Sequence, residues 1–406
     1  MKYLLFLGLI LTVSGSLIAD EPPTVLVYLL AGQSNMEGHA KVETLDYLAD
    51  NQDDRELYQL VMDANGKPRQ GNNVWISYLT GAGEPGTFAV GKLTTGFGAR
   101  QNPANDGGKI GPEYAFGLRM EQIQKKPIVI IKTAWGGKSL YYDFRSPSSG
   151  VYPRSASDIE KGRNPEAESG KYYRLMVEHT KKVLADLKSV YPEYQPGQKV
   201  QLAGFVWLQG WNDMVNREVY PIKDAEPTRP RYADYSKWMA NLIRDLRNDL
   251  SAPKLPAVIG VMGVGGSKPN EHVAAFRIAM AQPAALPEFR GNVLAVETSP
   301  FWDERLAAIA DKQEDVRQMA RMLRTKNKNG PNKDGAMNDQ QQKEYVEKYS
   351  NEIISPEELS LWKRGASNAG YHYLGCGKTF VGIGNAFAEA LANLQKKTEE
   401  IDKADQ

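Results

Sequence analysis

Continuous apolar runs, each ending in glycine and polar side chains, constrain the fold of this chain more than any other feature. Their residues scarcely alternate between apolar and polar, which is typical of parallel strands covered on both faces. Segments with helical periodicity lie between them. We therefore predict an α/β fold, a three-layer α/β/α sandwich with a mainly parallel five-stranded sheet and loop insertions. The predicted strands span 25–32, 127–133, 200–208, 257–264 and 292–297.

Ser34 lies just beyond the carboxyl end of the first run, where open α/β sheets bind their ligands. Gly32 permits a tight turn there, and a helix opening at Asn35 would surround the Ser34 hydroxyl with free backbone N–H groups. A nucleophile that generates an oxyanion beside itself needs such donors. A Ser or Asx cap in a strand-to-helix turn is the competing explanation.

Residues 32–36, Gly-Gln-Ser-Asn-Met, resemble the nucleophile block of the SGNH-type carbohydrate esterases, the relatives of sialate O-acetylesterase and acetylxylan esterase. The resemblance implies an SGNH-hydrolase-like, flavodoxin-like sheet with Ser34 as the nucleophile. The nucleophile elbow of α/β-hydrolases does not fit, because G-x-S-x-G needs glycine at the position of Met36. Gln33 and Asn35, which flank the serine, become candidates for substrate binding.

Two other strand ends carry candidate oxyanion donors. Gly136 has no side chain to block the approach of its N–H to the site that Ser34 attacks, although a plain turn also explains a glycine there. The resemblance maps 136–137 onto the glycine block of the family. It also maps Gln209 onto the Gln of a Gln-Gly-Glu-x-Asp block, whose side-chain N–H supports the oxyanion. Trp211 replaces the Glu of that block, so the role of that Glu does not carry over.

Aromatic residues beside these strand ends are candidates for sugar binding. Trp135 and Tyr141 follow the second run, and Trp211 follows the third. In a chain with 7 Trp and 20 Tyr, packing in the core is the alternative explanation for each ring.

His372 is the candidate general base. It lies in a loop between Gly370 and Gly375, late in the chain, where hydrolases with an early serine on an α/β sheet place their base. An imidazole with an ordinary pKa of about 6.5 both accepts and returns the proton of a serine hydroxyl. The alternative is a structural histidine.

The sequence does not identify the acid that would complete a catalytic triad. The resemblance implies Asp three residues before the catalytic His, and this chain has Ala369 there. The neighbouring Asn368 carries no charge, but Asn368 or a backbone carbonyl could orient the imidazole without an acid. Asp213, which follows the predicted oxyanion block, is our choice over Asp303, and a Ser–His dyad is the alternative.

Helical periodicity and turn residues predict the remaining elements. His179 is expected on the solvated face of its helix, and His272 early in another helix. Pro112 begins a helix with Glu113 near the positive end of its dipole. Further helices are expected over 172–187, 232–250, 303–323 and 378–394, with a helix-leaning segment at 45–62, a β-hairpin or two loop strands at 73–78 and 87–93, and a polar, mobile surface segment at 326–342.

Residues 1–19 are typical of a secretory signal peptide, with a positive start, an apolar core and small residues for cleavage. The apolar core is too short to cross a membrane, and no later segment is apolar for long enough. Cleavage after Ser16 or Ala19 fits equally. We expect 20–406 to form one secreted or periplasmic domain with insertions at about 39–110 and 303–366.

Composition excludes several classes of protein. The net charge of +1 gives no field that attracts nucleic acid or anionic lipid, and the single Cys376 excludes an intrachain disulfide. The four histidines lack the spacing of metal ligands, and no P-loop is present, so we expect no metal and no cofactor. The oligomeric state is not predictable from the sequence.

Together these features predict a serine carbohydrate O-acetylesterase. The expected substrate is an acetylated sugar, either sialic acid or a polysaccharide such as xylan, and the mechanism proceeds through an acyl-enzyme. The alternatives are a non-catalytic glycan-binding protein on the same fold and a broader arylesterase or lipase.

Overall fold

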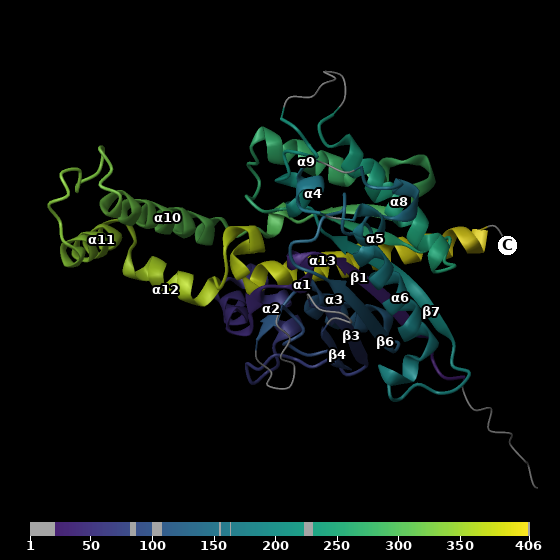
Figure 1. The fold of residues 1–406 in the computed structure, drawn as a ribbon. Coiled ribbons are helices and arrows are strands. Elements are labelled where there is room, and N and C mark those ends of the chain that lie inside the picture. The colour runs from purple at the N-terminus through teal and green to yellow at the C-terminus, as the bar shows by residue number, and fades with distance from the viewer. Residues whose placement is uncertain are drawn as a thin grey trace, which may run out of the picture.

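The computed structural model of the chain is organised around a seven-stranded sheet (Figure 1). The strand order is β4-β3-β6-β1-β7-β8-β9. The structure describes residues 21–81, 87–99, 108–153, 156–162, 164–222 and 230–404. The predicted signal peptide lies outside the described residues.

All five predicted strands are present and parallel, with β1 pairing on both sides, to β6 and to β7. Every residue of β1 and β6 is buried, as continuous apolar runs require when helices cover both faces of a sheet. The five strands are β1 (Val25–Gly32), β6 (Ile128–Ala134), β7 (Val200–Leu208), β8 (Ala257–Val261) and β9 (Val293–Glu297).

The sheet has two more strands than the five we predicted. β3 (Val74–Thr80) pairs parallel to β6, and β4 (Thr87–Lys92) pairs antiparallel to β3, so the expected hairpin extends the sheet. The sequence of β3 did not read as a central strand because it contains Ser77 and Thr80. Both side chains are buried and hydrogen-bonded, Ser77 with His179 and Thr80 with Glu37.

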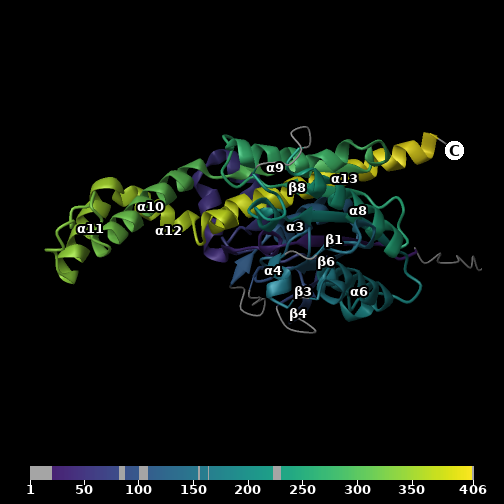
Figure 2. The ribbon, with the colours of Figure 1, turned by 45° about the horizontal axis from the view of Figure 1, so that its top comes forward.

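Helices cover the two faces of the sheet, and alternate residues of β1 point to each side. Leu26, Tyr28 and Leu30 pack with α3 (Pro112–Gln124) and α13 (Gly377–Ala404). Val25, Val27 and Leu29 pack with α6 (Lys171–Ala185), α8 (Ala233–Asp249) and α9 (Glu271–Ala281). α13 is 28 residues long, and Figure 2 shows it running across the whole body of the protein.

The helices predicted over 172–187, 232–250 and 303–323 are confirmed to within two residues at each end, whereas α13 continues from the predicted end at 394 to Ala404. The segment predicted at 45–62 divides into a 3-10 helix, η1 (Val42–Asp50), and α2 (Arg55–Val61). The expectation for His179 was wrong, because its side chain is buried and its Nε2 lies 2.9 Å from Ser77 Oγ. Burial lowers the pKa of His179 to about 4.

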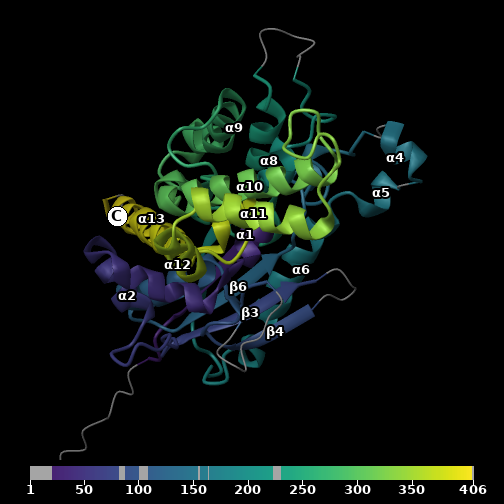
Figure 3. The same cartoon turned by 90° about the vertical axis from the view of Figure 1, so that its left-hand side faces the viewer.

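Three helices form an arm that projects from the body (Figure 1). They are α10 (Glu304–Arg324), α11 (Asp339–Ile353) and α12 (Pro356–Gly365), and α10 contacts the other two. Figure 3 faces the arm, with the sheet behind it. The arm spans most of the second predicted insertion, 303–366, and α11 buries none of its residues. Among the described helices, none is both long and apolar enough to span a membrane.

Candidate active site

Ser34 follows the carboxyl end of β1, where Gly32 lies directly beside Leu208 of the parallel strand β7. A Cβ on Gly32 would lie only 2.1 Å from the carbonyl oxygen of Leu208, so only glycine allows the two chains to approach this closely. After Gln33, the short helix α1 (Ser34–Glu37) begins at the serine itself. Ser34 is 8% exposed, at the carboxyl edge of the sheet where the sequence predicts it.

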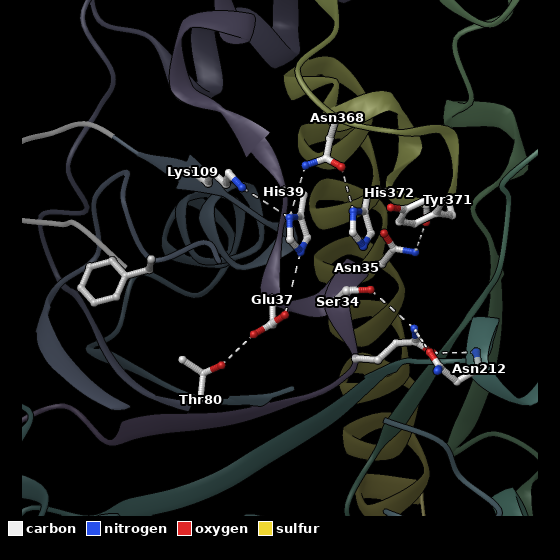
Figure 4. A network of polar contacts seen from close by, with 12 residues as sticks. Ser34, Asn35, Glu37, His39, Thr80, Lys109, Asn212, Asn368, Tyr371 and His372 are labelled. Carbon is white, nitrogen blue, oxygen red and sulfur yellow. Dashed lines mark hydrogen bonds and ion pairs between the residues drawn. The ribbon is translucent and has the colours of Figure 1, made fainter. Parts of the chain in front are cut away.

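His372 approaches the serine from a distant part of the chain. It lies in η9 (Gly370–Gly375), a distorted segment in which Tyr373 and Leu374 have positive φ angles of 51° and 59°. Asn35 Nδ2 donates a hydrogen bond of 3.1 Å to the Tyr371 carbonyl, which ties α1 to this segment. Figure 4 shows the His372 ring between Asn368 and the serine. No hydrogen bond between Ser34 and His372 is present in the described part of the chain.

The Asn368 amide fixes the tautomer of His372. The Nδ1 atom of His372 lies 2.9 Å from Asn368 Oδ1, and an amide oxygen only accepts. Nδ1 therefore carries the hydrogen, and Nε2 keeps the lone pair that a general base needs. Burial, with smaller contributions from His39 and Lys109, lowers the pKa of His372 to about 3, so the ring is neutral at pH 7.

Asp213, our predicted triad acid, makes other contacts and no hydrogen bond to His372. Its carboxylate accepts from four donors, which we call the Asp213 network: Leu140 N at 2.8 Å, Tyr141 N at 3.1 Å, Gln209 Nε2 at 2.5 Å and the Tyr220 hydroxyl at 3.0 Å. Burial raises the pKa of Asp213 to about 6, although these donors oppose the increase. Asp303 caps α10 at Leu306 N and accepts from Tyr47, away from the base as well.

Of the two predicted oxyanion donors, Gly136 lies beside the serine, whereas the Gln209 amide is engaged elsewhere. Gly136 adjoins the serine, because a Cβ placed on it would lie 3.8 Å from Ser34 Cβ. Both hydrogens of the Gln209 amide are engaged, one by Asp213 and one by the Lys138 carbonyl at 3.2 Å. Gln209 therefore acts here as part of the Asp213 network.

A different pair of amides lies beside the serine. Gln33 Nε2 is 3.5 Å from Ser34 Oγ and donates to Asn212 Oδ1 at 3.0 Å, as Figure 4 shows for Asn212. Gln33 Oε1 accepts from the N–H of Gly210 at 3.1 Å. Sequence reasoning missed Asn212, although its place after the third strand was the available signal. Gln33 and Asn35 are 2% and 4% exposed, so their side chains serve mainly these internal contacts.

The predicted sugar-binding rings separate into two groups. Trp135 is 3% exposed and packs against Phe144 and Tyr172, so it lies in the core, the alternative that the sequence left open for it. Trp211 is partly exposed and lies 5.8 Å from Tyr371 between ring centroids, and Tyr371 is 46% exposed. A small hollow beside them is lined by Gln33, Asn35, Leu208, Gln209, Gly210, Trp211 and Met262.

Sequence reasoning also missed Glu37 and His39. The His39 ring stacks on His372 with centroids 3.8 Å apart and planes at 1°. The preceding Gly38 packs directly on Gly111, because a Cβ there would lie 2.1 Å from Gly111 Cα. Glu37 Oε1 accepts from Thr80 Oγ1 at 2.8 Å. The proximity of Glu37 and His39 to the serine in sequence was the available signal.

A buried lysine supports this corner of the site. Lys132 Nζ donates to the carbonyls of Glu37 and Phe97, both at 2.8 Å, and to Glu113 Oε2 at 2.7 Å. The side chains of Lys132 and Glu113 are fully buried. Burial lowers the pKa of Lys132 and raises that of Glu113, and their attraction opposes both changes. Among the described residues, no group of three or more His, Cys, Asp or Glu side chains could hold a metal ion.

Comparison with known protein families identifies a match over most of the chain. A family model described as "Carbohydrate esterase, sialic acid-specific acetylesterase" matches residues 24–299, which include Ser34 and end before His372. No curated protein sequence matched the chain.

Several solved structures resemble the chain, among them the following three. One is a protein from Arabidopsis thaliana, with 17% identity, a TM-score of 0.38, and coverage of 68% of this chain and 87% of that one. Another is XAC1771, a carbohydrate acetylesterase from Xanthomonas citri, with 18% identity, a TM-score of 0.36, and coverage of 67% and 49%. The third is NanS, with 15% identity, a TM-score of 0.37, and coverage of 68% and 78%.

Proposed function

Because the chain belongs to the carbohydrate esterase family of sialic acid-specific acetylesterases, we propose that it removes O-acetyl groups from sugars through an acyl-enzyme on Ser34. The observation that carries the proposal is that α1, which begins at Ser34, contacts η9, whose His372 is a neutral imidazole held at Nδ1 by Asn368 (Figure 4). Such an imidazole directs its basic nitrogen away from Asn368, into the site.

The reaction begins when His372 Nε2 takes the Ser34 proton while Oγ attacks the acetyl carbonyl carbon. A serine hydroxyl needs such a base, because it is essentially un-ionised near neutral pH. The tetrahedral intermediate then expels the sugar oxygen, which receives the proton from His372. Water, activated by the same imidazole, attacks acetyl-Ser34 and releases acetate.

Backbone and side-chain amides stabilise the oxyanion in this proposal. The N–H groups of Ser34 and Gly136 and the side-chain amides of Gln33 and Asn212 lie around the serine or at the neighbouring strand ends. Each well-placed donor lowers the barrier by about 3 kcal/mol. The Gln209 side chain donates to the oxyanion only if its amide breaks the hydrogen bond to Asp213.

The sugar binds across the Trp211–Tyr371 pair. Sugar rings present apolar faces that stack on aromatic side chains, and Tyr371 is the more exposed of the two. Either an acetylated sialic acid or an acetylated polysaccharide fits this description. Export through cleavage of residues 1–19 belongs to the same proposal.

The test is acetate release by the wild-type protein and by Ser34→Ala. We expect the wild-type protein to release acetate from at least one member of a panel of acetylated sialic acids, xylans and other glycans. Ser34→Ala should be inactive yet retain its fold and its affinity for the glycan. Residual turnover by Ser34→Ala would rule out this nucleophile.

Two further readouts separate the alternatives. A glycan-binding protein without activity would bind the panel but release no burst of acetate. An arylesterase or lipase would hydrolyse octanoyl esters at least as well as acetyl esters, whereas a carbohydrate acetylesterase should prefer the acetyl group.

A further inference from the structure

We propose that His39 and Glu37 together replace the missing acid of the triad, His39 by orienting the Asn368 amide and Glu37 by supplying negative charge. Both act through His372 and are therefore positioning residues. The inference rests on the proposed function, because it concerns the same base.

The Asn368 amide bridges two stacked imidazoles. Its Oδ1 accepts from His372 Nδ1 at 2.9 Å, and its Nδ2 makes a longer contact of 3.5 Å with His39 Nδ1. Lys109 Nζ also lies 3.5 Å from His39 Nδ1. An amide NH₂ and an ammonium group only donate, so Nδ1 of a neutral His39 is the acceptor. The hydrogen of His39 is then on Nε2, which faces Glu37 Oε2 at 3.9 Å.

The two rings therefore have opposite tautomers, and this explains an amide at position 368. A carboxylate there would still accept from His372. It would, however, turn an oxygen lone pair toward the unprotonated Nδ1 of His39 and repel it. Asn368 satisfies both rings at once, but it cannot supply charge. The charge must come from another residue.

Glu37 is placed to supply it. Its carboxylate is held by Thr80 Oγ1 at 2.8 Å, and its carbonyl is fixed by the buried Lys132 at 2.8 Å. The side chain is 15% exposed, so water screens it only in part. His39 stacks on the base with centroids 3.8 Å apart, which sets the Glu37 carboxylate one ring away from the imidazolium that forms during the reaction (Figure 4).

The other groups beside the two rings are either positively charged, which disfavours protonation of His372, or neutral. Lys109 on β5 (Lys109–Ile110) is positive, and two protonated rings stacked this closely would repel each other. The remaining neighbours are Tyr371 with its ring 4.4 Å from His372, Ser34 and Asn35 on α1, and Asn368. Glu37 is therefore the carboxylate that the described contacts set beside the stack.

The test is the pH profile of acetate release for Glu37→Gln, His39→Phe and Asn368→Asp. Glu37→Gln keeps an oxygen for Thr80 but removes the charge. We expect kcat to fall about tenfold, equivalent to one pKa unit of lost imidazolium stabilisation, with KM unchanged. The acid limb of the profile should move to lower pH. Asn368→Asp adds a charge at His372 and should move the limb to higher pH.

Two further variants guard against a merely structural effect. His39→Phe keeps the stacked ring but loses the contacts to Asn368 and Glu37, so it should also lower kcat. In the double variant Glu37→Gln/Asn368→Asp, the new aspartate should restore part of the lost kcat. The matched control is Glu43→Gln, an exposed glutamate paired with Lys41, which should behave as wild type.

The outcomes separate the two proposals. If Ser34→Ala is inactive while Glu37→Gln and His39→Phe keep wild-type kcat and pH profile, this inference is overturned and the proposed function stands. If Ser34→Ala still releases acetate, the proposed function fails first. A fall in kcat without any movement of the acid limb would also overturn the role of Glu37.

Discussion

Two polar networks at the same edge of the sheet use their charges in opposite ways. In the Asp213 network the carboxylate is fully buried, and it accepts from four donors contributed by the segments that follow β6 and β7 and by Tyr220. The stacked histidines His39 and His372 are only partly buried, and a neutral amide joins them. One network is saturated with hydrogen bonds, while the other leaves the basic nitrogen of His372 without a hydrogen bond among the described residues.

This difference distinguishes a network that holds the backbone in place from one that suits the proposed proton transfer. A carboxylate saturated by donors fixes the backbone around it but has no capacity left to orient a base. A base needs an unoccupied lone pair and a partner that sets its tautomer, and Asn368 provides the partner. The acid closest to the predicted oxyanion block thus serves structure, and the proposed base is held by Asn368, which the sequence offered as an alternative to an acid.

The largest effect should follow from removing the base. We expect His372→Ala to lower kcat by a factor of about 10³ to 10⁴, because proton transfer from Ser34 then depends on water. Steady-state acetate release at pH 7 measures the loss. His272→Ala, which removes another partly buried histidine with a lowered pKa, is the control and should remain active. Equal losses in both variants would contradict the assignment of the base.

The next largest effect should follow from removing the carboxylate of the Asp213 network. Asp213→Ala leaves buried donors at Leu140, Tyr141, Gln209 and Tyr220 without an acceptor. We expect the free energy of unfolding to fall by about 3 to 5 kcal/mol, measured by urea denaturation. If Asp213 were instead the acid of the base, the variant would lose kcat while its stability stayed near wild type.

Much of the fold, and part of the candidate site, could be predicted from local sequence patterns. The five apolar runs predicted the five parallel strands, and a strand end predicted where Ser34 lies, because both depend on neighbours in sequence. The loop with glycines around His372 indicated a base for the same reason. These features need no knowledge of tertiary contacts.

The remainder depends on contacts between distant segments. β3 was not predicted as a central strand because its buried Ser77 and Thr80 find partners far along the chain. The stacking of His39 on His372 joins a residue near the start of the chain to one near its end, so no local pattern reveals it. Asp213 shows the converse, since a favourable sequence position did not bring it to the base.

The two networks should also respond oppositely to pH. Asp213 has a pKa raised from 3.8 to about 6, so the folded protein holds its proton more tightly than the unfolded chain does. Its contribution to stability is full below about pH 4 and is lost as pH rises toward 6, a change of about 3 kcal/mol. His372, with its pKa lowered to about 3, contributes stability that is full above pH 6.5 and is lost on acidification.

Urea denaturation between pH 4 and pH 7 measures both contributions by difference. The stability of Asp213→Asn relative to wild type should improve as pH rises over this range. The stability of His372→Gln relative to wild type should decline over the same range, since wild type regains the favourable neutral imidazole. Parallel pH dependences in the two variants and wild type would contradict both pKa changes.

The smallest effect should come from Lys109, whose positive charge lies beside the stacked histidines and helps to lower the pKa of His372. Its ammonium group lies 3.5 Å from His39 Nδ1 and is the last of three causes that lower the pKa of His372. Lys109→Gln removes that positive charge, so the pKa of His372 should rise and the acid limb of kcat/KM should move upward by less than about one pH unit. Activity at pH 7 should change little, because the base is neutral there in both proteins. The matched control is Lys41→Gln, because Lys41 lies opposite Lys109 where β2 (Ala40–Lys41) pairs antiparallel with β5. An equal movement of the acid limb in that variant would assign the effect to net charge alone.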